Sequence, residues 1–180
     1  MKFNKFIVSL ALCSVTLFGD EIISPFAEVQ YDMLHGKAHS LSDSASSSTS
    51  FVSLHGGVVL EKYHARIYLG YEPIRWNDAQ ADITSINVDY IKPIINDTLK
   101  GYVGAGIGGM SYKADPLKDE TTKAIFTMRA GINYDINSFV YLTTGIKYIF
   151  TNNIEIKDSN TLYSKIDNLI GGEIGLGVKF

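Results

Sequence analysis

Apolar and polar residues alternate along most of the chain, beginning near residue 25. In the segment PFAEVQYDM, residues 25–33, one parity holds Ala27, Val29, Tyr31 and Met33, and the other holds Glu28, Gln30 and Asp32. This period of two is typical of a strand with one apolar face, because successive side chains of a strand point to opposite sides. The same alternation recurs at 51–60, 63–72, 84–90, 99–109, 124–134, 140–150 and 169–180. The pattern predicts eight β-strands of about ten residues each.

The connections between these segments alternate in length. Short connections are expected at 61–62, 92–97 and 135–138, and long ones at 34–50, 73–82, 111–123 and 151–164. Short turns at one end and long loops at the other are typical of outer-membrane barrels with an even number of strands. The sequence therefore predicts an all-β fold, an eight-stranded antiparallel up-and-down transmembrane β-barrel, with both ends of the barrel domain on the periplasmic side.

Aromatic residues on the apolar parity gather near the two ends of the expected strands. The middle positions hold aliphatic residues and glycine, and almost no charge falls on this face. A soluble barrel would bury such a face inside, whereas a membrane barrel turns it to lipid and places aromatic rings at both interfaces. We therefore predict two aromatic girdles, formed by Tyr31, Tyr63, Tyr71, Tyr90, Tyr134, Tyr148 and Phe150, with Phe126 and Phe180 as further members.

The opposite parity collects charged residues of both signs. The interior of an eight-stranded barrel is just wide enough for side chains to fill it, and an unpaired buried charge is costly. We therefore expect a lumen filled by a salt-bridged polar cluster, with a narrow porin-like channel as the alternative. The predicted cluster is Glu28, Arg66, Lys100, Arg129, Lys147 and Glu173, and Asp32, His64, Glu72, Asp89, Asp167 and Lys179 share its parity.

The first 19 residues have the pattern of a signal peptide. Two lysines precede an apolar run from Phe6 to Phe18, which is too short to span a bilayer as a helix. We expect cleavage after Gly19, leaving residues 20–180 as the barrel domain. The only cysteine, Cys13, lies in the removed segment, so neither a disulfide framework nor a thiol nucleophile is expected. A lipoprotein alternative requires a small residue where Leu12 stands.

Composition and charge exclude several other classes of protein. The chain is 46% apolar with only four prolines, which argues against a disordered chain. Its formal net charge is −3 and no block of like charges occurs, so nucleic acid is not an expected partner.

Two stretches contain residues that could bind a cofactor or a metal ion, but the residues around them do not form the structure that such sites need. The segment GAGIGG, residues 104–109, fits a dinucleotide-binding fingerprint, but no helix is expected to follow it, so no cofactor is predicted. Small residues there would instead make room for bulky lumen residues such as Tyr102, Arg129 and Tyr141. His35 and His39 are four apart in a segment that is not helical, so no metal site is predicted.

The same serine-rich loop allows one enzymatic alternative. His39, Asp43 and Ser44 could be assembled into an acyltransferase-like set for lipid A, although any serine-rich loop would offer one. The deacylase pattern His-x-Ser is absent. We therefore predict no catalytic residue, and a lipid-modifying barrel enzyme remains the alternative function.

The signal peptide, the eight alternating strands, the alternation of turns and loops and the terminal Phe180 resemble the small eight-stranded outer-membrane barrels of Gram-negative bacteria. That group includes the OmpA membrane domain, OmpX and the neisserial opacity proteins. The resemblance implies a monomer in the bacterial outer membrane, surrounded by lipid and lipopolysaccharide, with external loops that contact a host or cell-surface ligand. Trp76 and Tyr112 are candidate loop contacts. The resemblance also implies that Ile174, Leu176, Val178 and Phe180 are recognised by the barrel-assembly machinery.

Overall fold

The computed structural model describes residues 23–40, 44–75, 79–114, 121–151, 154–158, 161–166 and 168–180. The predicted signal peptide, Trp76 and Asp43 lie outside these ranges. Its strands are β1 (Ile23–Ser40), β2 (Ser44–Leu60), β3 (Ala65–Arg75), β4 (Ala79–Ile95), β5 (Leu99–Ala114), β6 (Thr121–Asp135), β7 (Val140–Phe150), β8 (Ile154–Asp158), β9 (Thr161–Ile166) and β10 (Leu169–Lys179).

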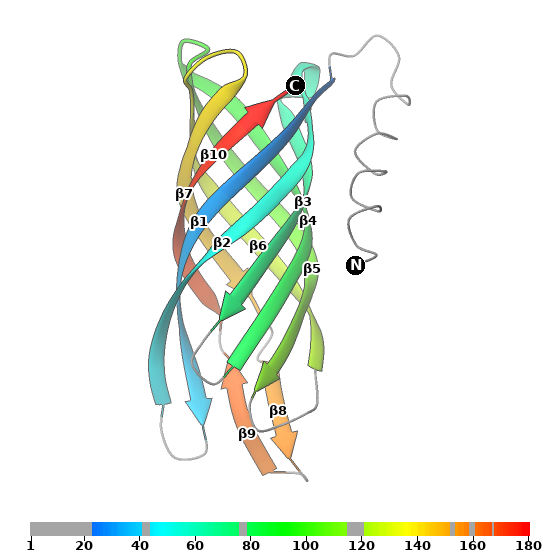
Figure 1. Ribbon diagram of the computed structural model, residues 1–180, viewed down its shortest axis with the longest axis vertical. Helices are drawn as coiled ribbons and strands as arrows, with labels where there is room; N and C mark the ends of the chain where they lie inside the picture. The colour runs from blue at the N-terminus through cyan, green and yellow to red at the C-terminus, as the bar shows by residue number, and fades with distance from the viewer. Residues whose placement is uncertain are drawn as a thin grey trace.

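Eight of these strands close into an antiparallel barrel, as the sequence predicted (Figure 1). Strands β1 to β7 pair with their neighbours in chain order, and β10 pairs with both β7 and β1. Val29 of β1 lies opposite Leu176 of β10, which closes the sheet in register. Closure gives every barrel strand a paired neighbour on both sides, and this is a condition for spanning lipid with strands.

The turns at residues 61–64, 96–98 and 136–139 mark one end of the barrel, which we call the short-turn end. The expected two-residue connection at 61–62 is in fact longer. Residues Glu61–Tyr63 form a 3-10 helix, and His64 adopts a left-handed conformation with φ of 51°. The prediction that His64 faces the lumen from a strand was wrong. Two-residue hairpins favour residues such as Asn-Gly, which Glu61 and Lys62 do not supply, so the chain reverses over four residues.

The opposite end carries long β-ribbons where the sequence suggested loops, and we call it the ribbon end (Figure 1). Strands β1 and β2 remain paired as far as His39 and Ser44. The expected loop at 151–164 contains β8 and most of β9, and β9 also pairs with the extension of β1, from Ala38 to Ser40. The alternation of apolar residues in the sequence ends before these extensions, but backbone pairing needs no such alternation to continue.

The two faces of the barrel differ sharply in chemistry. Outward side chains are apolar and exposed, as with Val29 at 51% and Ile107 at 65%, whereas inward Asp32 is fully buried. No helix among the described residues is long and apolar enough to cross a membrane.

Inward glycines make room for large lumen side chains. A Cβ atom at Gly177 would overlap the ring of Tyr141, and one at Gly104 would overlap the carboxylate of Asp89. At outward Gly172, by contrast, the nearest atom would be 3.8 Å away. Glycine is therefore required by packing on the inner face and tolerated on the outer one.

Candidate functional site

The middle of the lumen holds a network of buried ion pairs built from neighbouring strands. Arg66 of β3 is 2% exposed and donates to Asp89 at 2.6 Å and to Glu28 at 3.1 Å. Its guanidinium also lies 5.3 Å from the ring centroid of Phe26 and 5.3 Å from that of Tyr68. A cation with two carboxylates and two aromatic faces is well compensated for its loss of water.

A second pair links β6 to β10 across the lumen. Arg129 donates to Glu173 at 2.5 Å, and the hydroxyl of Tyr102 donates to the same carboxylate oxygen at 2.6 Å. Arg129 also donates to the hydroxyl of Tyr68. These contacts join residues 44 to 71 positions apart in the chain, so they exist only once the barrel has closed.

Lys147 of β7 forms the third centre of the network. Its ammonium lies 2.8 Å from Asp32, 3.1 Å from Glu72 and 3.5 Å from Glu173. Ser53 donates a further hydrogen bond of 2.5 Å to Asp32. Glu173 thus contacts both Lys147 and Arg129, and it joins the ion pairs of these two cations into one network.

Five of the six residues of the predicted polar cluster lie in this network, namely Glu28, Arg66, Arg129, Lys147 and Glu173. Lys100 does not. Its ammonium lies at the short-turn end, where it pairs with Asp135 at 2.9 Å and the side chain is 21% exposed. Lys100 is the second residue of β5, at a level where the lumen opens to solvent. Asp167, which shares the inward parity in the sequence, lies outside the described ranges.

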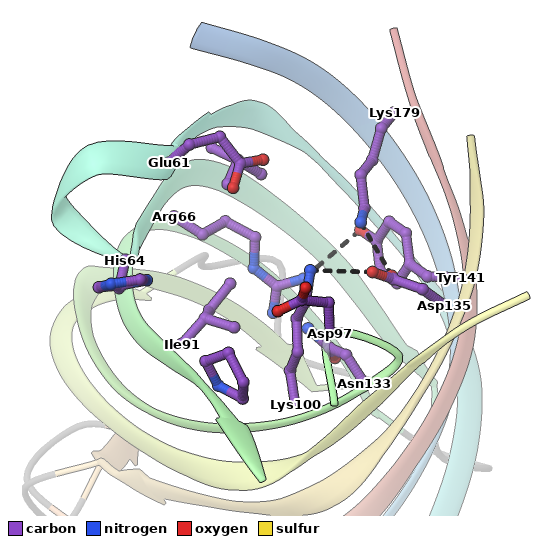
Figure 2. A pocket seen from close by; sticks show the side chains of 12 residues that line it. Glu61, His64, Arg66, Ile91, Asp97, Lys100, Asn133, Asp135, Tyr141 and Lys179 are labelled. Atoms are coloured by element: carbon purple, nitrogen blue, oxygen red, sulfur yellow. Dashed lines mark hydrogen bonds and ion pairs between the residues drawn. The ribbon is translucent and has the colours of Figure 1, made fainter. Parts of the chain in front are cut away.

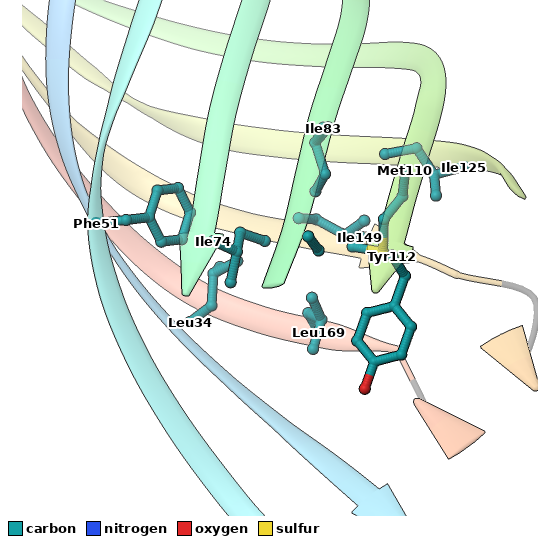
Figure 3. Packing of buried hydrophobic residues seen from close by; sticks show 10 residues of the cluster. Leu34, Phe51, Ile74, Ile83, Met110, Tyr112, Ile125, Ile149 and Leu169 are labelled. Carbon is teal, nitrogen blue, oxygen red and sulfur yellow. The ribbon is translucent and has the colours of Figure 1, made fainter. Parts of the chain in front are cut away.

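Towards the ribbon end the lumen is apolar, whereas a polar cluster was expected to fill it. All eight barrel strands contribute to a cluster of side chains with at most 7% exposure (Figure 3). We call this the inner apolar cluster, and it comprises Leu34, Phe51, Ile74, Ala81, Ile83, Met110, Tyr112, Ile125, Ile149 and Leu169. A signal was present in the sequence, since pairs such as Met33-Leu34 and Ile149-Phe150 place apolar residues on both parities.

Tyr112 belongs to the inner apolar cluster and is 4% exposed. The prediction that it contacts external partners from a loop was therefore wrong. Residue 112 lies within β5, which continues to Ala114, so its side chain follows the inward parity of that strand. The other candidate loop contact, Trp76, lies outside the described residues.

The predicted girdle residues lie on the outer surface at two levels. Tyr63, Tyr90 and Tyr134 are each at least half exposed near the short-turn end, and Tyr31, Tyr71 and Phe150 are exposed towards the ribbon end. Tyr148 is partly buried, with its ring centroid 4.5 Å from that of Phe150. On β10 and at the end of the chain, Ile174, Leu176, Val178 and Phe180 all face outward, with exposures between 36% and 72%.

The short-turn end opens into a cavity of about 210 Å³, which we call the mouth pocket (Figure 2). Arg66 and Tyr141 line its inner part, and Lys100, Asp135 and Lys179 line its side. Lys179 lies 2.8 Å from Asp135, so one carboxylate is shared by two ammonium groups.

No grouping of three or more metal-ligating side chains occurs among the described residues. Of the acyltransferase-like set, His39 and Ser44 are paired in the β1–β2 register. A different histidine, His35, makes a hydrogen bond of 3.0 Å with the hydroxyl of Ser48 on the exposed outer surface.

Comparisons with known proteins support the fold. No family model matches the chain, and no curated protein sequence matches it. Among solved structures, neisserial surface protein A (NspA) is 20% identical with a TM-score of 0.63, covering 86% of this chain and 97% of its own. Outer membrane protein H of Pseudomonas aeruginosa is 18% identical with a TM-score of 0.57, covering 87% and 99%. The N-terminal β-barrel domain of OprF from P. aeruginosa is 12% identical with a TM-score of 0.53, covering 84% and 97%.

Proposed function

We propose that this chain, which has the fold of the small eight-stranded outer-membrane β-barrels, is an integral protein of a bacterial outer membrane with a structural or surface-interaction role. The observation that carries this proposal is its outer surface. Between the two levels of aromatic side chains, the outward positions of the described strands hold no Asp, Glu, Lys or Arg. One such charge at the bilayer midplane would cost about 2–4 kcal/mol.

A gel assay tests the membrane-barrel part of the proposal. Folded barrels resist detergent at room temperature, so the expected result is a different mobility before and after boiling. The protein should also fractionate with outer membranes. Identical mobility, together with recovery from the soluble periplasm, would rule out this part.

The proposed barrel does not conduct ions freely. Two features of the lumen support this, namely the ion-pair network around Lys147 and the inner apolar cluster between that network and the ribbon end. An ion would have to leave water, cross an apolar layer and displace paired charges. In planar bilayers we expect at most small, rare conductance steps. Large and steady pores would favour the channel alternative.

The surface role belongs to the ribbon end, where β1 and β2 extend to Ser40 and Ser44 and the β8–β9 hairpin stands beside them. NspA, a structure with this fold, is named a surface protein, which supports such a role. The proposed partners are lipopolysaccharide and a host or cell-surface ligand, and the proposed state is a monomer.

Replacing residues 154–166 by a short Gly-Ser linker tests the surface role. The deletion spares the barrel strands, so folding by the gel assay should be retained while adhesion of expressing cells or envelope integrity declines. A matched control shortens the periplasmic turn at 136–139, which should not change adhesion. Unchanged adhesion and integrity in the hairpin deletion would argue against this role.

A lipid-modifying enzyme remains the second candidate, favoured only by the His35–Ser48 hydrogen bond. A serine beside a histidine is the minimal arrangement for acyl transfer. Alanine substitutions of His35, Ser48, His39 and Ser44 test it through lipid A mass spectra. On our proposal the spectra are the same with and without the protein and for every variant. Loss of a lipid species in both the His35→Ala and Ser48→Ala strains would establish the enzyme instead.

A further inference from the structure

We propose that the mouth pocket binds a short peptide of two or three small residues with free amino and carboxyl ends. This goes beyond the surface role, because it concerns the opposite end of the barrel and a different ligand. The proposal rests on three observations, which are the charge balance of the pocket, a buried acceptor without a partner and the size of the cavity.

Charges of both signs line the pocket in equal number. Three cations, Arg66, Lys100 and Lys179, face three carboxylates, Glu61, Asp97 and Asp135. Arg66 is already paired with Glu28 and Asp89 deeper in the lumen. Lys100 and Lys179 share only Asp135 among the ion pairs of the described residues, although each ammonium has three donors. Their spare donors form a binding position for a carboxylate.

The acidic Glu61 lies across the mouth from these lysines, as Figure 2 shows. Glu61 follows β2, and Asp135, the carboxylate that both lysines share, ends β6, which is four strands away in a barrel of eight. A ligand that spans the mouth therefore meets ammonium groups at one end and a carboxylate at the other. This arrangement favours a zwitterion with separated charges over a polyanion, which Glu61 and Asp97 would repel.

Asn133 favours a ligand that carries a hydrogen-bond donor between its two charged ends. Its side chain lines the pocket and is 5% exposed, and its Oδ1 atom has no hydrogen-bond partner among the described residues. An acceptor left unpaired in a buried position is costly, so a donor from a ligand would be favourable there. The peptide N–H of a dipeptide lies between its charged ends and supplies such a donor.

The size of the cavity sets the length of the ligand. Its volume of about 210 Å³ corresponds to roughly seven water molecules at ~30 Å³ each. An extended dipeptide is about 7 Å long, which separates its two charges without requiring large side chains. The pocket therefore suits small residues such as alanine and glycine.

The test is a titration of the folded, isotope-labelled protein in detergent micelles, followed by NMR. The probes are Ala-Ala, N-acetyl-Ala-Ala, Ala-Ala amide and free alanine. We expect saturable shifts for Ala-Ala at the Asn133 side-chain amide and at the backbone of residues 100 and 179. Each capped peptide should bind at least about tenfold more weakly because one charge-assisted contact is lost. Free alanine should bind more weakly by a similar factor, because it is too short to reach both charged ends and has no peptide N–H.

Variants provide the matched comparison. Lys100→Met combined with Lys179→Met should abolish the shifts, whereas Lys92→Met, which removes a charge at the same end but outside the pocket, should leave them unchanged. Equal binding of either capped peptide, no saturable shift with Ala-Ala, or full binding by the double variant would each overturn the proposal. If the double variant does not fold, the capped peptides still decide the question on the unaltered protein.

Discussion

At the scale of single residues, the alternation of inward and outward positions along a strand decides how much space a side chain can occupy. Gly177 lies against the ring of Tyr141 inside the barrel, whereas at Gly172 on the same strand, which faces outward, the atom nearest to an added Cβ would be 3.8 Å away. Residue type alone does not distinguish these two glycines. Only the parity of β10 distinguishes the glycine that packing requires from the one that it does not.

Substituting these two glycines should therefore have unequal effects. Gly177→Val is expected to destabilise the barrel by about 1–3 kcal/mol, because the added atoms overpack the lumen against Tyr141. Gly172→Val is the matched control and should change stability little. The measurement is reversible urea unfolding in detergent micelles. Equal stability of the two variants would contradict the close packing at Gly177.

At the scale of elements, β10 combines two roles that are separable by experiment. It closes the barrel by pairing with β1 and β7, and its outward residues form the proposed recognition signal for assembly. The closing role follows from the register itself. The recognition role rests on resemblance and stays a prediction.

Removal of Phe180 tests the recognition role. Phe180 is 72% exposed at the end of the chain, and its N–H donates to the carbonyl of Pro25. Its deletion should reduce the fraction of heat-modifiable protein in the outer membrane of cells, while refolding in detergent is retained. Phe139→Ala is the control, because Phe139 is a similarly exposed aromatic residue near the same end but outside β10. An equal loss in both variants would indicate interfacial anchoring and not recognition.

At the scale of the whole molecule, the lumen is layered. The mouth pocket lies at the short-turn end, the ion-pair network occupies the middle and the inner apolar cluster lies towards the ribbon end. The inner apolar cluster gives the barrel a buried core of its own, as in a water-soluble protein, and it joins all eight barrel strands.

Truncation of Met110 tests whether this cluster stabilises the barrel. Met110 is fully buried in the inner apolar cluster, and Met110→Ala is expected to cost about 2–5 kcal/mol because it leaves a cavity. The control is Ile107→Ala on the same strand, since Ile107 is 65% exposed on the outer surface and its removal leaves no internal cavity. Unfolding of both variants in the same micelles should show the larger loss for Met110. The reverse order would mean that the cluster is not a packed core.

Much of the architecture was predictable from local pattern. A period of two defines a strand with two different faces, and eight such segments joined by alternating short and long connections define an up-and-down barrel. The same parity predicted correctly that Arg66, Arg129 and Lys147 lie inside. It placed Lys100 in the buried network wrongly, because parity specifies the side of a residue and not its depth along the barrel.

The sequence by itself determined the eight strands, their two faces and the charges turned inward, because these properties depend on residues that are neighbours in the chain. Only the tertiary structure decided which charges meet, as with Lys147 and Asp32, which are 115 positions apart. It also decided that Tyr112 is buried and that Asp135 is shared by two lysines at the mouth. Such contacts depend on strand register, tilt and closure, which bring distant residues to the same level of the lumen.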